Sequence, residues 1–231
     1  MSDQIVLFGA ADFAAIAFTY FSEASPYQVA AFTVHREHRQ ADEFMGRPLV
    51  DFETLTATHP PDRYAMYVAV GQSKLNKTRA RVYHLAKDAG YRLVSYVHPS
   101  VQIWSNTTIG DNVFVFDHCT VQPFSTIGDD AILWCGCDIG HNAVIGKHCF
   151  VAGQAVVSGH SSLGDYTYLG VNATVRDRVA VAADNMIGAG ALIMRNTKPR
   201  QVFAPARSQA EKMDSYRLFG LEEAPADGEG A

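Results

Sequence analysis

Residues 126–145 read TIGDDAILWCGCDIGHNAVI, and they carry a pattern that repeats every six residues. An aliphatic residue recurs at Ile127, Leu133, Ile139 and Ile145. The residue two places earlier is small each time: Ser125, Ala131, Cys137 and Ala143. The aliphatic series continues at every sixth position from Ile103 to Ile193. Ordinary composition does not produce such a run by chance, so the repeat defines this part of the chain.

A period of six matches neither an amphipathic helix nor a long alternating strand. It is typical of a parallel β-helix, in which each hexad forms one short side of a triangular coil. The aliphatic residue and the small residue then both point inward, because they are two positions apart on a strand. Three sides close a coil after eighteen residues, and glycines recur at that interval: Gly110, Gly128, Gly146 and Gly164. We therefore predict about five stacked coils, with glycine at one corner because the backbone there is tight or has positive φ.

The segment before the repeat has a different organisation. Strands are predicted over 5–8, 28–34, 64–70 and 92–97, and helices over 11–22 and 74–89. Strands that alternate with helices indicate a parallel, Rossmann-like α/β unit. The expected domains are therefore residues 1–96 (α/β), 97–200 (β-helix) and 201–231, which comprises a turn, a short helix over 209–219 and a disordered tail.

Composition excludes several classes of protein. The net charge of -5 argues against a nucleic-acid binder, and no apolar run is long enough to span a membrane. The first residues lack a basic region of the kind that precedes a signal peptide, so we expect a cytoplasmic protein. Cys119, Cys137 and Cys149 fall in the small-residue slot of the repeat, and Cys135-x-Cys137 lacks zinc-site spacing, so we predict neither disulfides nor a metal site.

The chain resembles the NeuD/PglD-type sugar acyltransferases of the hexapeptide-repeat superfamily. The resemblance covers roughly residues 4–207 and rests on the hexads and on four further segments: Ile5–Ala10, Val97–Ser100, Gly188–Ala191 and Ala204–Arg207. It implies a left-handed β-helix and a homotrimer with active sites between neighbouring prisms. It also implies acetyl-CoA as donor, without a metal, and a nucleotide-linked sugar as acceptor bound by the N-terminal domain.

The resemblance also assigns the reacting groups. The family base is a His just after an Ile-Gly pair, which is His141 here, and Gly159, one coil further on, would offer a backbone N–H to the acetyl carbonyl. Family members often follow the base with an acidic residue, but Asn142 stands there and can orient the ring without adding charge. Nine residues after the base Phe150 replaces a histidine, so a group near the acetyl position is lost. Asp117 and Asp138 are alternative acidic partners.

Binding residues are expected for both substrates, the acetyl donor CoA and the acceptor nucleotide sugar. Residues expected beside CoA are Phe150, Gly159, Val171, Ala189, Gly190, Arg195, Pro205, Ala206 and Arg207, the arginines being expected at its phosphates. Residues expected beside the nucleotide sugar are Gly9, Ala10, Ala11 and Asp12 at the pyrophosphate, His35, Arg36, Gly71 and Lys74 at base and ribose, and His118. His160, like His118, is a turn histidine that could line the same cleft.

Several functions remain open at this point. We expect an N-acetyltransferase that acts on a nucleotide-linked amino sugar, and O-acetylation of a sugar hydroxyl on a sialic-acid-like acceptor is the nearest alternative. A non-catalytic trimeric scaffold or sensor is a third possibility, because Asn142 and Phe150 depart from the family pattern. A nicotinamide-dependent enzyme is disfavoured, because only the first glycine of the dinucleotide fingerprint is present at Gly9 and the second strand ends in His35-Arg36 rather than an acidic residue.

Overall fold

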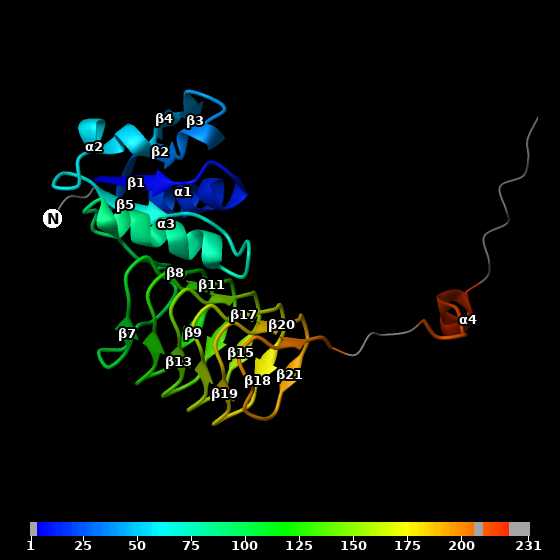
Figure 1. The fold of residues 1–231 in the computed structure, drawn as a ribbon. Coiled ribbons are helices and arrows are strands. Elements are labelled where there is room, and N and C mark those ends of the chain that lie inside the picture. Colours follow the sequence, from blue (N-terminus) through cyan, green and yellow to red (C-terminus); the bar gives the residue numbers. More distant parts are fainter. Residues whose placement is uncertain (1–3, 206–209, 222–231) are drawn as a thin grey trace, which may run out of the picture.

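The structure is a computed structural model that describes residues 4–205 and 210–221. An N-terminal α/β domain lies across one end and one face of a stack of short parallel strands (Figure 1). The α/β unit and the β-helix, which the sequence predicts on either side of the point where the hexad repeat begins, are thus both present, and they pack against each other.

The N-terminal sheet has the strand order β3-β4-β2-β1-β5 and is parallel except for the antiparallel pair β3 and β4. Its elements are β1 (Gln4–Phe8), α1 (Asp12–Ala24), β2 (Gln28–Val34), β3 (Glu43–Phe44), β4 (Arg47–Asp51), α2 (Leu55–Thr58), β5 (Ala65–Val68) and α3 (Lys77–Asp88). Side chains of β1 alternate between the two sides, so that Ile5 and Leu7 pack with α1 while Val6 and Phe8 pack with α3. Helices therefore cover both faces, which agrees with a Rossmann-like unit except for the antiparallel edge.

Some elements differ from the sequence prediction. Strands β3 and β4 and helix α2 were not expected, because their residues are largely exposed and carry little apolar periodicity. The strand predicted over 92–97 is divided between the domains. Leu93 makes an isolated bridge to Met66 of the first sheet, whereas β6 (Tyr96–Val97) pairs with β8 in the β-helix.

The repeat region forms three parallel sheets, which are the faces of a prism. The first face contains β7 (Thr108–Ile109), β10 (Thr126–Ile127), β13 (Val144–Ile145), β16 (Ser162–Leu163) and β19 (Ala180–Val181). The second contains β6, β8 (Phe114–Val115), β11 (Ile132–Leu133), β14 (Phe150–Val151), β17 (Tyr168–Leu169), β20 (Met186–Ile187) and β22 (Val202–Phe203). The third contains β9 (Thr120–Val121), β12 (Asp138–Ile139), β15 (Val156–Val157), β18 (Thr174–Val175) and β21 (Leu192–Ile193).

The predicted aliphatic residues from Ile109 to Ile193 form or line the core of the prism, whereas Ile103, the first of the predicted series, precedes β7 and is 36% exposed. Cys119, Cys137 and Cys149 are buried there as free thiols among Val, Ile, Leu and Ala side chains. Paired strands from β6 to β21 are eighteen residues apart, as in Ile127 with Ile145, so each of these coils closes after three hexads, and the final pair, β20 with β22, is sixteen apart. The arrangement fits a left-handed β-helix of hexapeptide repeats.

Three columns of turns join the faces, and we name each by one residue. The His141 corner, between the third and first faces, includes residues 123–124, 141–142, 159–160, 177–178 and 195–196. The Val171 corner, between the second and third faces, includes residues 117–118, 135–136, 153–154, 171–172 and 189–190. The Asp130 corner, between the first and second faces, includes residues 111–112, 129–130, 147–148, 165–166 and 183–184.

The corner glycines are required by close approach rather than by positive φ. A Cβ on Gly128 would lie 2.8 Å from the carbonyl carbon of Gly146 in the next coil. The left-handed residue of that turn comes two positions later, at Asp130, with φ of 58°. The positive φ expected at the corner is therefore real but belongs to a neighbouring position.

Aromatic side chains join the two domains. Phe114, Phe116 and Trp134 project from the second face and pack against Phe13 and Tyr20 of α1. This apolar contact fixes the position of α1 relative to the second face of the β-helix.

The C-terminal region is described only in part. Helix α4 (Ser215–Phe219) is shorter than the helix predicted over 209–219, because the Asp214 side chain accepts a hydrogen bond from the Arg217 N–H and caps it. The predicted tail lies mostly outside the described residues. Within 4–205 and 210–221, no helix combines the length and apolar character needed to cross a membrane.

Candidate active site

His141 lies at an exposed turn directly after β12. Its backbone N–H donates to Gln122 Oε1 at 3.0 Å, and its Nδ1 lies 3.1 Å from Asn142 Oδ1. The ring also contacts that of His160, one coil along, at a centroid distance of 4.9 Å and an angle of 90°. These contacts orient the imidazole without placing a carboxylate at Nδ1.

Gly159 lies directly against the His141 ring. A Cβ at Gly159 would be 2.7 Å from His141 Nε2 and 3.0 Å from Cε1. Any larger residue would therefore displace the ring or the turn. His141, Asn142 and Gly159, predicted from two different coils, come together at the His141 corner.

The turns give other histidines a structural role that His141 does not share. His118, His148 and His160 all adopt left-handed backbone, with φ of 57–58°. Histidine is one of the side chains that this conformation tolerates best after glycine. Asn142, rather than His141, occupies the left-handed position of its own turn, with φ of 59°. The fold thus gives a reason for Asn142 and for the other turn histidines but none for an imidazole at 141.

The two alternative acidic partners lie in different surroundings. Asp117 is on the Val171 corner, where it accepts hydrogen bonds from the Tyr20 hydroxyl at 2.7 Å and from Cys135 Sγ at 3.4 Å. The Tyr20 bond, more than the Cys135 bond, lowers the pKa of Asp117. Asp138 is in β12, three residues before His141, and its Oδ1 is buried without a hydrogen-bond partner among the described residues.

The residues expected beside CoA are divided between two corners and a domain interface. Val171, Ala189 and Gly190 are exposed on the Val171 corner. Pro205 lies at the same end, with its Cδ 3.1 Å from the position of a Cβ on Gly188. Phe150 is 6% exposed on the second face, where it stacks on Tyr168 at 5.5 Å. Ala206 and Arg207 lie outside the described residues.

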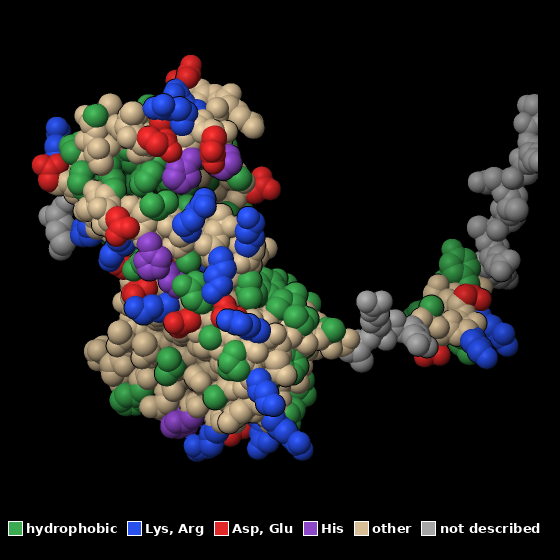
Figure 2. All heavy atoms as spheres, in the orientation of Figure 1, with side chains coloured by type: hydrophobic (Ala, Val, Ile, Leu, Met, Phe, Trp, Pro, Cys, Tyr) green, Lys and Arg blue, Asp and Glu red, His purple; other side chains and the backbone are tan. Residues whose placement is uncertain are grey.

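Arg195 lies on the His141 corner beside Arg176 and Arg178, two arginines that the sequence analysis did not single out. A hollow of about 460 Å³ there is lined by Arg176, Arg178 and Arg195 together with Asp177. In Figure 2, basic side chains gather at this end of the β-helix, around β19 and β21. The signal in the sequence was the Arg176-Asp-Arg178 turn, which lies eighteen residues before Met194 and Asn196 on the same corner.

Two predicted acceptor segments line a cavity between the domains. Asp12 at the start of α1 and Gly71 after β5 face Phe150 and Val171 across about 310 Å³. Gly9 precedes this helix with φ of 137°, and a Cβ there would be 2.6 Å from the Ala69 carbonyl oxygen. Ala10 and Ala11 complete the turn, and no side chain caps the helix at Ala11. Further lining residues are Trp134, Tyr168 and Gln72, which sequence reasoning missed.

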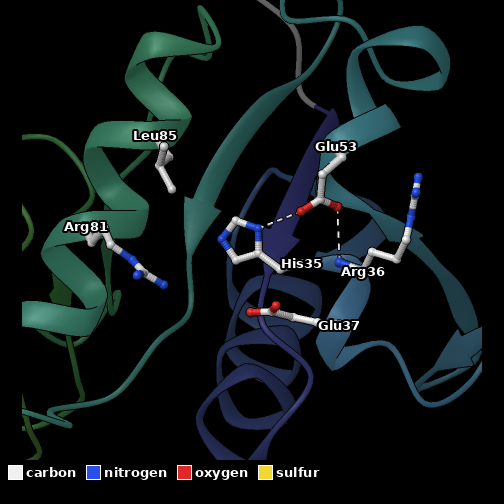
Figure 3. A pocket seen from close by; sticks show the side chains of 6 residues that line it. All are labelled: His35, Arg36, Glu37, Glu53, Arg81 and Leu85. Atoms are coloured by element: carbon white, nitrogen blue, oxygen red, sulfur yellow. Dashed lines mark hydrogen bonds and ion pairs between the residues drawn. The ribbon is translucent and has the colours of Figure 1, made fainter.

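His35 and Arg36 lie at a second cavity, of about 640 Å³ (Figure 3). His35 Nδ1 donates to Glu53 Oε1 at 2.8 Å, and the Arg36 N–H donates to Glu53 Oε2 at 3.1 Å. The bond from His35 lowers the pKa of Glu53. Arg81 and Leu85 of α3 form the opposite wall. Glu53 and Arg81 lacked a sequence signal, because one follows the unpredicted strand β4 and the other lies within a helix of mixed polarity.

The remaining predicted acceptor residues lie outside both cavities. Lys74 is exposed in the loop before α3, with φ of 51°. His118 is exposed on the Val171 corner, and its Nε2 lies 3.5 Å from Asp117 Oδ2.

The fold and the repeat match known proteins. Residues 124–159 match the family model "Bacterial transferase hexapeptide (six repeats)". A mutant of perosamine N-acetyltransferase from Caulobacter crescentus, in complex with CoA and GDP-perosamine, is 26% identical, with a TM-score of 0.79 over 90% of this chain and 97% of that one. The chain is a hexapeptide-repeat acyltransferase. The resemblance to this superfamily is thus confirmed.

Two further structures share the fold of this acyltransferase. The acetyltransferase domain of PglB from Neisseria gonorrhoeae FA1090 is 20% identical, with a TM-score of 0.77 over 87% of this chain and 96% of that one. WeeI from Acinetobacter baumannii AYE is 19% identical, with a TM-score of 0.74 over 88% of this chain and 99% of that one. The α/β domain is therefore shared with these proteins as well as the repeat.

Proposed function

We propose that the protein transfers an acetyl group from acetyl-CoA to an amino group of a nucleotide-linked sugar, in the cytoplasm, for surface polysaccharide or glycan biosynthesis. Support comes from the similarity along almost the whole chain to perosamine N-acetyltransferase, which was crystallised with CoA and GDP-perosamine. The observation that carries the proposal is the His141 ring, which is exposed at a corner with Gly159 against its Nε2 edge.

His141 is the proposed general base. A hydrogen bond from Nδ1–H to Asn142 Oδ1 leaves the lone pair on Nε2, which takes a proton from the acceptor amine as its nitrogen attacks the thioester carbonyl. The Gly159 N–H stabilises the developing oxyanion. When the C–S bond breaks, the CoA thiolate leaves and the imidazolium returns a proton to it.

An amine is favoured over a hydroxyl as the acceptor. Asn142 orients the His141 ring but, being uncharged, adds no electrostatic stabilisation of the imidazolium. A neutral amine is already a nucleophile and needs less assistance from a base than a hydroxyl does. The electrostatics of this corner therefore suit N-acetylation.

The separation of the candidate residues favours a homotrimer with sites between subunits. The base lies on the His141 corner, whereas Asp12, Gly71 and Val171 lie around a cavity beside the Val171 corner of the same chain. In a ring of three copies, one subunit's His141 corner can face the next subunit's Val171 corner, because such contacts are heterologous and close after three steps.

The two substrates would enter this site from opposite directions. The arginines at 176, 178 and 195 lie beyond Gly159 along the His141 corner and would hold the CoA phosphates. On the acceptor side, the turn 9–12 would hold the pyrophosphate at the start of α1, and the cavity at His35 and Arg36 would hold the base and ribose.

Thiol release from acetyl-CoA tests the proposal against a panel of UDP-, dTDP- and GDP-linked 4-amino sugars. We expect one sugar to give rapid release and a product heavier by one acetyl group. His141→Ala should lower kcat/KM with that sugar by roughly 100- to 10,000-fold, since a positioned base contributes about this much. Release only with hydroxyl acceptors would replace the proposal by O-acetylation, and failure to bind acetyl-CoA would indicate a scaffold.

A further inference from the structure

Helix α3 runs along the Asp130 corner and contacts successive coils of the β-helix. In the middle of the helix the Tyr83 hydroxyl donates to Asp111 Oδ1 at 2.6 Å, and near the C-terminal end Lys87 pairs with the same carboxylate. At its N-terminal end Lys77 pairs with Asp184 at 2.6 Å, four coils away. Figure 1 shows this helix lying on top of the stacked strands. The helix is thus fixed at both ends to the domain that carries His141.

Arg79 is the centre of this contact and is fully buried. Its Nε lies 3.2 Å from Asp130 Oδ2, and its Nη2 donates to the carbonyl oxygens of Asp130, His148 and Cys149 at 3.0–3.2 Å. Asp130 is itself held by Asn112 Nδ2 at 2.7 Å and by His148 Nδ1 at 2.7 Å. The guanidinium therefore binds the backbone carbonyls of two turns as well as the Asp130 carboxylate.

The same guanidinium reaches the loop that precedes α3. Arg79 Nη1 donates to the Gly71 carbonyl oxygen and to Asn76 Oδ1, both at 3.3 Å. Asn76 is buried, and its Nδ2 donates to the Tyr166 carbonyl oxygen at 3.3 Å. One buried cation thus connects the β-helix to both ends of the segment 71–76.

This loop has an unusual backbone and lines the cavity between the domains. Lys74, Leu75 and Asn76 all have left-handed backbone, with φ of 51°, 52° and 64°. Such a run is costly for residues with side chains and persists only where the surroundings hold it. Gly71 and Gln72 at its start face Asp12 and Val171 across the cavity.

We propose that Arg79 and Asn76 are positioning residues that hold the 71–76 loop in the shape required to bind the nucleotide sugar. A buried ion pair is weak evidence for stability alone, since apolar residues of equal size often stabilise a fold better. The hydrogen bonds to Gly71 and Asn76 give this pair a geometric role. The inference rests on the proposed function to the extent that the cavity takes the acceptor.

Asn76→Gly is the most informative variant. Glycine adopts positive φ freely, so the backbone of the loop remains accessible while the bonds to Arg79 and Tyr166 are lost. Arg79→Lys, which keeps the charge but loses the fork of donors, is the second variant. Tyr83→Phe is the matched control, because it removes only the hydrogen bond from the same helix to Asp111 and leaves in place the ring that contacts His148.

The test measures hydrogen exchange of segment 71–76 and calorimetric binding of GDP, UDP, dTDP and CoA to the full chain. In both variants we expect faster exchange in the loop. We also expect about tenfold weaker binding of whichever nucleoside diphosphate binds wild type, as loss of roughly one or two hydrogen bonds implies. CoA affinity should fall less than nucleotide affinity, because only Phe150 and Val171 of the residues expected beside CoA share this cavity with Gly71 and Gln72, whereas the arginines proposed at its phosphates lie on the His141 corner. Tyr83→Phe should resemble wild type in both measurements.

Unchanged loop exchange in Asn76→Gly and Arg79→Lys would overturn the proposal. So would faster exchange with unchanged nucleotide affinity, since the loop would then move without consequence for binding. Equal losses for CoA and nucleotide, in variants and control alike, would also overturn it by indicating a general structural effect. If wild type binds none of the three nucleotides, the acceptor assignment fails, and the exchange rates alone decide whether the network holds the loop.

Discussion

At the scale of single residues, the His141 corner brings together two residues. The fold gives no reason for an imidazole at position 141, whereas close contact with that ring requires glycine at position 159. Histidines elsewhere in the turns occupy left-handed positions, whereas His141 precedes one. Gly159 is fixed by contact, because its missing Cβ would lie 2.7 Å from Nε2. The proposed function accounts for both choices, since it uses His141 as an accessible base and Gly159 as a backbone donor one coil away.

Gly159→Ala should therefore impair catalysis more than stability. The added methyl group displaces the imidazole from the backbone that would stabilise the oxyanion, and we expect kcat to fall by about tenfold or more, as loss of preorganised geometry implies. Steady-state kinetics and a thermal melt of the same sample measure both effects. A variant with wild-type kcat would show that the contact between ring and backbone plays no part in transfer.

Asn142→Asp tests the electrostatics of the same corner. Aspartate tolerates the left-handed backbone at this position, so the turn should persist. Its carboxylate would stabilise the imidazolium, and the acidic limb of the kcat/KM profile should move to higher pH by roughly one unit. The pH–rate profiles of wild type and variant measure the shift. Profiles that coincide would assign the titrating base to another residue.

At the scale of elements, the sequence determined the β-helix almost completely. The hexads place the inward aliphatic residues from Ile109 onward, because each coil uses the same short strand and the same turn, and they fail only at the exposed Ile103. The α/β domain was less predictable. Strands β3 and β4 lie at an exposed edge without apolar alternation, and the strand predicted over 92–97 serves both domains. Phe150 shows what the sequence could not predict about the site. Only the structure shows that its ring is buried at the domain interface, between Trp134 and Tyr168.

The contact between α1 and the β-helix carries a pH-dependent contribution to stability. The hydrogen bond from Tyr20 lowers the pKa of Asp117 in the folded protein. Stability from a carboxyl with a depressed pKa is complete above its unfolded pKa, about 3.9, and is lost as the pH falls through the folded value.

Tyr20→Phe should therefore lower the free energy of unfolding at pH 7 by about 1.5 to 3 kcal/mol, the range for a hydrogen bond to a charged group. Below about pH 4 the difference from wild type should diminish, as the protonation of Asp117 requires. Urea unfolding at a series of pH values measures it. A difference that is constant across the series would assign the effect to ring packing rather than to the Asp117 bond.

At the scale of the whole molecule, one chain presents the proposed base and the proposed acceptor cavity at different corners of a prism. The hexad phase assigns His141 and Val171 to different turns, but only the structure shows that the α/β domain places its cavity beside the Val171 corner. The three predicted regions (base, CoA corner and α/β domain) are arranged so that a second copy would complete the site. The proposed trimer therefore makes catalysis dependent on assembly.

Subunit complementation tests the account most directly. His141→Ala removes the base from one corner, and Ala189→Trp fills the other with an exposed bulky ring, so each variant alone should be inactive. Denatured together in equal amounts and refolded, they should regain about a quarter of wild-type thiol release, because random trimers place two intact halves together at that frequency. A mixture that stays inactive, while refolded wild type recovers, would contradict a site that combines His141 of one subunit with the Val171 corner of the next.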